Sequence, residues 1–129
     1  MLLAVGERLW GSLDPQMVRM ATAFGGGVGG TRQEMCGALS GGVMVLGAHL
    51  APNHPTGNEN RLRQAVARYR ERFVEGIGPT QCAALLDGLY GAEGKEPCSV
   101  LVQRAVRLLL QVLNETNEAK GAALPGDQA

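Results

Sequence analysis

The residues of this chain that could do chemistry are three thiols, Cys36, Cys82 and Cys98. An odd number of cysteines does not suit the disulfide framework of a small secreted protein. In a reducing compartment, thiols serve in catalysis, metal binding or redox sensing more often than as structural cross-links. Cys82 follows Pro79 by three residues and Cys98 follows Pro97 directly. Because proline favours the first turn of a helix, both thiols are predicted to lie at helix starts.

Cys36 is also predicted to lie near a helix start. Thr31 and Glu34 have the Thr-x-x-Glu spacing of a capping box, which places Cys36 in the second turn of a helix that begins at Thr31. Free N–H groups and the macrodipole at a helix N-terminus lower the pKa of a thiol. We therefore expect a reactive thiolate, best placed at Cys36, to attack an oxidised partner before Cys82 or Cys98 resolves the mixed disulfide. Cys82 and Cys98 could also pair with each other, and inert packing is the alternative for each thiol.

The elements that must position these thiols are predicted to be helices. Aromatic residues make up only 4% of the 129-residue chain, and helix formers dominate outside one glycine-rich stretch. This length fits one domain with a single core. We predict an all-α, compact single-domain bundle of about five to six helices around a glycine-rich central helix, with the domain over residues 1–120 and a disordered tail over 121–129. The predicted helices cover residues 2–10, 14–25, 31–50, 58–76, 78–90 and 97–120.

Two of these helices have informative apolar patterns. The helix over 58–76 carries a single apolar stripe, so it is predicted to lie on the surface of the core. The helix over 97–119 is apolar on more than one face, which predicts either a central position or a homo-oligomer contact. The stripe of the first comprises Leu62, Ala65, Val66, Tyr69, Phe73 and Ile77.

The glycine-rich stretch over residues 24–42 is predicted to allow a close approach of backbone. Gly37 and Gly41, like Ala38 and Gly42, are small residues at four-residue spacing on a predicted helix. A neighbouring helix could then bring a second thiol within disulfide reach of the first. A phosphate-binding loop is not indicated, because Thr-Arg replaces the Lys-Ser/Thr of that motif and a helix, not a strand, precedes it.

Charge and hydropathy exclude several classes of function. The formal net charge is zero, so no overall field attracts nucleic acid or anionic lipid. Five arginines between residues 61 and 72 are diluted by glutamates and are predicted to form a solvated face. The weakly charged run over 35–52 is near the lower length limit of a membrane span, yet its four glycines favour a buried helix. The apolar N-terminus is interrupted by Glu7 and Arg8 and is a poor signal peptide, so a cytoplasmic location is predicted.

The segment Cys-Gly-Ala-Leu-Ser-Gly over residues 36–41 resembles the Cys-Gly-Ala-x-x-Gly element of the C_GCAxxG_C_C family of redox-active proteins. The glycine-rich segment before it, the segment Gly-Gly-Val-Met-Val-Leu-Gly after it, and two later single cysteines extend the resemblance over nearly the whole chain. The family pattern has a fourth cysteine near the N-terminus that has no counterpart here. Either the chain begins downstream of that residue or this member has lost it.

The resemblance implies thiol–disulfide exchange or electron transfer, with a thiol protein or a small oxidant as the redox partner. It does not say whether the protein is an enzyme, and it implies no cofactor. The residues it singles out are Cys36, Cys82 and Cys98 as the catalytic set, with Gly37, Ala38 and Gly41 as the supporting motif.

Two other classes of function stay open. Three thiolates are one ligand short of the Cys₄ set of an iron–sulfur cluster or a zinc site, and no Cys-x-x-Cys pair is present. His54, in a predicted loop, could complete such a set, whereas His49 lies 13 residues beyond Cys36 on the same predicted helix. The third class is a non-catalytic helical oligomerisation module, which the apolar last helix favours.

Overall fold

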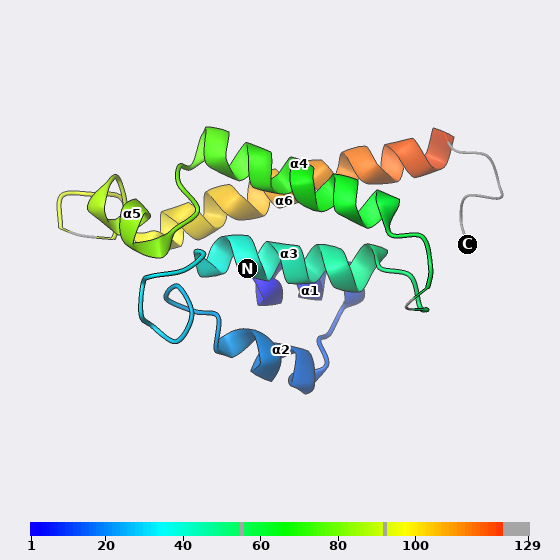
Figure 1. Ribbon diagram of the computed structural model, residues 1–129, viewed down its shortest axis with the longest axis horizontal. Helices are drawn as coiled ribbons and strands as arrows, with labels where there is room; N and C mark the ends of the chain where they lie inside the picture. The colour runs from blue at the N-terminus through cyan, green and yellow to red at the C-terminus, as the bar shows by residue number, and fades with distance from the viewer. Residues whose placement is uncertain (55, 92, 123–129) are drawn as a thin grey trace.

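The computed structural model describes residues 1–54, 56–91 and 93–122, and over these residues it contains six helices and no strand. Figure 1 shows α3 running along the middle of the molecule, between α2 on one side and α4 and α6 on the other. The predicted all-α fold is therefore confirmed. The helices are α1 (Leu2–Trp10), α2 (Pro15–Thr22), α3 (Gly37–Leu50), α4 (Asn60–Gly76), α5 (Cys82–Asp87) and α6 (Cys98–Ala122).

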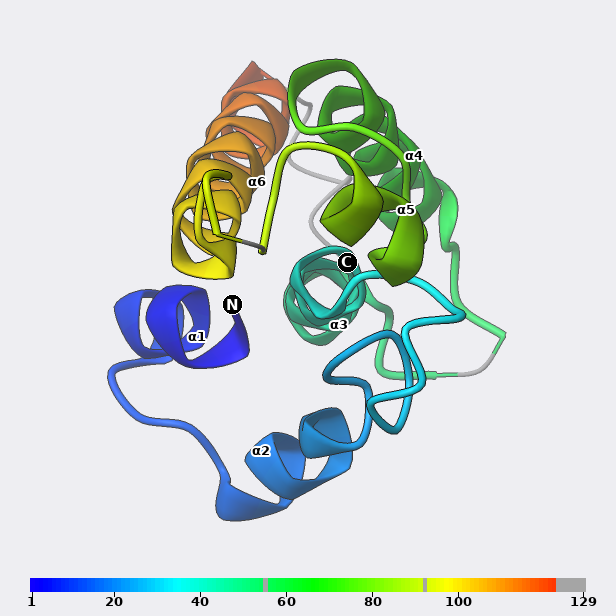
Figure 2. The same cartoon turned by 90° about the vertical axis from the view of Figure 1, so that its left-hand side faces the viewer.

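The glycine-rich helix α3 is the central element. It packs against α1, α4 and α6, and the end-on view in Figure 2 shows these helices arranged around it. Burial on most of its circumference explains why its sequence has almost no charge. None of the described helices is both long enough and apolar enough to span a bilayer. The buried residues of α3 are Ala38, Leu39, Ser40, Gly41, Gly42, Val45 and Leu46.

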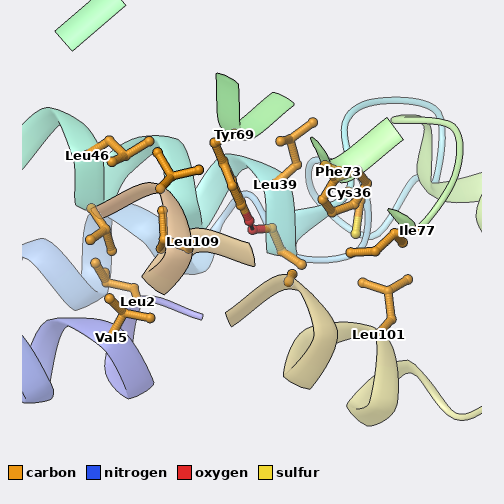
Figure 3. Packing of buried hydrophobic residues seen from close by; sticks show 14 of the residues in the cluster. Leu2, Val5, Cys36, Leu39, Leu46, Tyr69, Phe73, Ile77, Leu101 and Leu109 are labelled. Atoms are coloured by element: carbon orange, nitrogen blue, oxygen red, sulfur yellow. Dashed lines mark hydrogen bonds between the residues drawn. The ribbon is translucent and has the colours of Figure 1, made fainter. Parts of the chain in front are cut away.

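The apolar stripe of α4 faces this central helix as its spacing predicts. Tyr69 and Phe73 are fully buried, and their rings meet edge to face with centroids 6.4 Å apart. The hydroxyl of Tyr69 donates a hydrogen bond of 2.9 Å to the carbonyl of Ala38 in the first turn of α3. Figure 3 shows Tyr69 reaching into the cluster that also contains Leu39 and Cys36. This hydrogen bond anchors α4 to the N-terminal end of α3.

Helix α6 owes its dense apolar pattern to three partners within the chain, since it packs on α1, α3 and α4. Ion pairs cover the junction with α4: Glu115 accepts from Arg72 at 2.7 Å and from Arg68 at 3.2 Å. Arg61 also donates to the carbonyl of Thr116 at 3.1 Å. Part of the arginine-rich face of α4 therefore holds α6 in place. The buried residues of α6 are Leu101, Ala105, Leu109, Val112, Leu113 and Thr116.

The helix start at Asp14 and Pro15 is confirmed, because the Asp14 carboxylate accepts a hydrogen bond of 2.8 Å from the N–H of Gln16. The predicted start of the third helix at Thr31 is wrong. The Thr31 hydroxyl donates to carbonyls of the preceding loop instead of capping a helix. Arg32 has a φ of 64°, which a right-handed helix cannot accommodate, so α3 begins only after Cys36.

Two other predicted boundaries change. Helix α5 covers only part of the range 78–90, because the residues on either side of it make hydrogen bonds with other segments. Helix α6 includes Gly121 and Ala122, which the prediction assigned to the tail over 121–129. The remainder of that tail lies outside the described residues.

A pair of glycines in α3 tests the packing. A Cβ on Gly42 would lie 2.6 Å from Cζ and 2.7 Å from the hydroxyl oxygen of Tyr69, whereas a Cβ on Gly47 meets nothing within 4 Å. We expect Gly42→Ala to lower the free energy of unfolding by about 1–2 kcal/mol, because overpacking outweighs the gain in helix propensity. Gly47→Ala should raise it by roughly 0.5–1 kcal/mol. Urea unfolding followed by circular dichroism measures both, and a stabilised Gly42→Ala variant would contradict the packing.

Candidate thiol site

The three cysteines line one cavity of about 410 Å³. The loop before α3, helix α5 and the beginning of α6 gather at the same end of the molecule (Figures 1 and 2). The structure thus brings together residues that are up to 62 positions apart in the sequence, from Cys36 to Cys98. The other walls come from the N-terminal residues and α1, from α2 and the loop that follows it, and from the N-terminal turns of α3 and α6. Their residues are Met1, Leu2, Leu3, Val18, Ala21, Thr22, Phe24, Gly25, Gly26, Gly37, Ala38, Ser40, Gly41, Leu101 and Val102.

All three thiols lie at helix starts. Cys36 is the N-cap residue of α3 and not, as predicted, a residue of its second turn. Cys98 is the first residue of α6, directly after Pro97 as predicted, whereas α5 begins at Cys82, three residues after Pro79, so Pro79 does not start that helix. The helices that hold the three thiols therefore converge on the cavity with their N-terminal ends.

Cys36 and Cys82 are tied together by a short antiparallel bridge between Met35 and Gln81. The N–H of Cys36 donates a hydrogen bond of 2.7 Å to the carbonyl of the residue that precedes Gln81. The N–H of Cys82 donates one of 2.9 Å to the carbonyl of the residue that precedes Met35. Both cysteines line the cavity, whereas Met35 and Gln81 are not among its lining residues. Diagonal neighbours in a regular pair lie roughly 7–8 Å apart. Disulfides need roughly 4.4–6.8 Å between Cα atoms, so at such a diagonal spacing a disulfide forms only if the backbone moves closer.

The glycine run before Cys36 forms a left-handed loop. The residues from Gly26 to Gly30 have φ angles between 64° and 72°. A side chain in this conformation costs roughly 1–2 kcal/mol, and only Val28 within the run carries one. The loop explains the glycines: it turns the chain back so that Gly27 packs directly against Cys82, where a Cβ on Gly27 would lie 2.7 Å from the Cβ of Cys82.

The same loop covers the N-terminus of α5. The carbonyl of Arg32 accepts a hydrogen bond of 2.8 Å from the N–H of Ala83, and the carbonyl of Glu34 accepts the N–H of Cys82. Gln81 adds a side-chain hydrogen bond of 2.9 Å to the carbonyl of Gln33. These donors are therefore used in holding the loop and are not available to a thiolate.

The pKa of Cys36 is raised, and the cause is burial of the thiol. The backbone N–H groups of Ala38 and Leu39 act in the opposite direction, and the neighbouring thiols Cys82 and Cys98 raise the pKa further. The expectation of a low-pKa thiolate at Cys36 is therefore wrong. Only 9% of Cys36 is exposed, whereas Cys82 is half-buried and Cys98 is exposed. Figure 3 shows Cys36 as a member of the buried cluster.

Among the described residues, no three histidine, cysteine or carboxylate side chains are grouped so that they could hold a metal ion. His49 lies near the far end of α3 from Cys36, about 20 Å along the helix axis. His54 lies in the loop beyond that end. This part of the chain therefore gives no geometric support to the iron–sulfur or zinc alternative.

Sequence reasoning missed the apolar walls of the cavity. Leu3 and Phe24 line it although both are more than 40% exposed. It also missed the proximity of Tyr69 to the site: burial and then the Cys36 thiol raise the pKa of this tyrosine. Its place on an apolar stripe indicates only that Tyr69 belongs to the core.

Comparison with known proteins gives two results. The family model described as "Putative redox-active protein (C_GCAxxG_C_C)" matches residues 1–112. A protein of Archaeoglobus fulgidus, described as "Uncharacterized protein", is 31% identical over 126 residues, and the match covers 88% of this chain and 81% of that protein. No solved structure matches.

The burial of the thiols predicts their order of reaction with iodoacetamide. We expect Cys98 to react first, Cys82 next and Cys36 last, because access decreases in that order. Since the pKa of Cys36 is raised, its rate should still increase at a pH where a free thiol, with a pKa of about 8.5, is already mostly ionised. Mass spectrometry of chains that retain a single cysteine measures each rate. If Cys36 labels faster than a free peptide thiol at pH 7, the burial argument fails.

Two glycines of the loop separate backbone strain from contact with the thiol. Gly27→Ala and Gly29→Ala both place a side chain at a positive φ, but only the first meets other atoms, the Cβ of Cys82 at 2.7 Å and the backbone of Arg32 at 2.9 Å. We expect both variants to be destabilised by about 1 kcal/mol or more. Only Gly27→Ala should change the alkylation rate of Cys82, by severalfold. Equal rates in the two variants would show that the loop does not constrain this thiol.

Proposed function

This chain belongs to the C_GCAxxG_C_C family, and from that premise we propose that it is a redox protein that exchanges thiols and disulfides through Cys36 and Cys82. The observation that carries the proposal is the short bridge that holds these two cysteines on one side of the cavity. The third thiol, Cys98, lines the same cavity. The three thiols are free in the structure, which corresponds to the reduced form.

The degree of burial assigns the order of the steps. Cys82 is the more exposed of the pair, so its thiolate attacks one sulfur of an oxidised disulfide partner. The S–S bond of the partner breaks, and the first partner sulfur leaves and takes up a proton. Cys36 then loses its proton and attacks the Cys82 sulfur of the mixed disulfide, and the second partner sulfur leaves as a thiol. Two electrons have passed from the pair to the partner, and a Cys36–Cys82 disulfide has formed.

Cys98 is assigned to the wall of the cavity rather than to the pair. The bridge between Met35 and Gln81 joins the segments that carry Cys36 and Cys82, whereas Cys98 begins a different helix, α6. Cys98 is held by α6 and has its sulfur close to Gly91, where a Cβ would lie 3.6 Å from Sγ. The exposed thiol is suited to hold or release a partner at the cavity, while the disulfide forms behind it.

Compartment and assembly follow as further parts of the proposal. Free thiols in a dithiol centre suit a reducing compartment such as the cytoplasm. Helix α6 already buries apolar residues against three helices of its own chain, so its apolar pattern does not require a homo-oligomer. The homo-oligomer contact through residues 97–119 stays a prediction.

Single substitutions test the pairing. Mild oxidation with diamide should lower the free thiols of the parent chain from three to one, and those of Cys98→Ser from two to none. Cys36→Ser and Cys82→Ser should keep both remaining thiols free, because each lacks one member of the pair. Thiol titration and peptide mapping without reduction measure the result. Loss of the disulfide in Cys98→Ser, with its retention in Cys82→Ser, would assign the pair differently and refute this mechanism.

A further inference from the structure

We propose that the cavity takes a small, uncharged organic disulfide as the oxidised substrate of the Cys36–Cys82 pair. The inference rests on the proposed function, because it assigns a substrate class to the same thiols. This substrate class excludes charged disulfides. The residues that line the cavity support it.

The first argument is the charge of the walls. None of the described residues that line the cavity is Asp, Glu, Lys, Arg or His. Besides the thiols, the ionisable group on a lining residue is the amino group of Met1, whose pKa is lowered by burial. A charged substrate group would lose its hydration here without gaining an oppositely charged partner. An uncharged substrate loses nothing comparable.

The second argument is that only two of the described lining residues, Thr22 and Ser40, carry hydroxyl groups. The Thr22 hydroxyl donates to the carbonyl of Val18 at 2.7 Å. The Ser40 hydroxyl lies 3.4 Å from the carbonyl of Gly37 and 3.5 Å from that of Cys36. A polar substrate would therefore find few side-chain donors, whereas Leu2, Leu3, Phe24, Leu101 and Val102 offer apolar contact.

The third argument is size. A volume of about 410 Å³ lies at the lower end of the range of roughly 300–1,000 Å³ that is typical of small-molecule sites. It can hold a short dialkyl disulfide beside the thiols. The balanced reaction is one dithiol plus R–S–S–R giving one protein disulfide plus two R–SH, with the two thiol protons of the protein transferred to the two products.

A charge series of disulfides tests this substrate class. The reduced full-length chain is mixed at pH 7 with diethyl disulfide (neutral), 3,3′-dithiodipropionate (anionic) or cystamine (cationic). Each rate of Cys36–Cys82 formation is divided by the rate of the same reagent with a free dithiol peptide, which removes the intrinsic reactivity of the reagent. We expect the neutral reagent to be favoured at least tenfold over both charged reagents. A smaller ratio, or a preference for the anion that would point to the Met1 amino group, overturns the proposal.

Two exposed leucines give a matched pair of variants. Leu3 lines the cavity and is 53% exposed, whereas Leu89 is 68% exposed and is not among the lining residues. Leu3→Trp should slow the reaction with diethyl disulfide at least fivefold, and Leu89→Trp should leave it unchanged. Equal rates in the two variants contradict the proposal. If Leu3→Trp does not fold, the charge series on the parent chain still decides.

Oxidation by diamide distinguishes a failure of the substrate class from a failure of the redox function. If diamide forms the Cys36–Cys82 disulfide but the normalised rates do not depend on charge, the substrate class fails and the redox function stands. If diamide forms no disulfide in the parent chain, the redox function itself fails.

Discussion

The hydrogen bond from Tyr69 to the carbonyl of Ala38 is the contact on which the arrangement of the site depends. It joins the middle of α4 to the first turn of α3, two residues from Cys36. It can form only because Gly42 leaves room for the tyrosine ring against the helix. A buried phenol without a partner would cost about 1–3 kcal/mol, so the hydroxyl fixes how closely and at what height the two helices pack. The N-terminus of α3, and with it Cys36, is thereby set within the core.

The glycine loop supplies the second constraint, which is the position of Cys82. Helix α5 is short, and it has few contacts that could hold it against the bundle without help. The first N–H groups of α5 donate hydrogen bonds to carbonyls of the residues just before Met35, and these bonds hold its first turn. Because Gly27 has no side chain, the loop can lie directly on Cys82. A left-handed turn reverses the chain within a few residues, and glycine makes that turn at almost no steric cost. The glycine-rich stretch over residues 24–42 therefore has two structural roles. Gly27 lets the loop lie on Cys82, and Gly42 leaves room for Tyr69.

The local sequence was sufficient for elements whose start and stop signals lie within one turn. Asp14 with Pro15, and Pro97 before Cys98, predict helix starts because capping and the fixed φ of proline are local effects. Pro79 does not, since α5 begins only at Cys82. The capping-box pattern over residues 31–34 predicted a helix start that does not form, and the reason lies outside these four residues. The positive φ at Arg32 belongs to the turn that carries the loop back to α5, which is a tertiary requirement. The apolar walls of the cavity were likewise beyond local reasoning, because α1, α2 and α6 contribute to them only after packing.

The pKa of Cys36 shows how two opposing effects at a helix start are decided by their size. The end of a helix stabilises a nearby charge by typically 0.3–1 kcal/mol when the group is exposed. Burial can shift a pKa by up to several units, each worth about 1.4 kcal/mol. For a thiol that is only 9% exposed, burial therefore prevails over the helix terminus. A cysteine kept protonated in this way is a poor first nucleophile, and it lines the same cavity as the more accessible Cys82. In the exchange that we propose, the second attack is intramolecular, so a high local concentration of the mixed disulfide would compensate for the small fraction of thiolate. The burial that limits the reaction of Cys36 with solvent is therefore compatible with the resolving role that we propose for it.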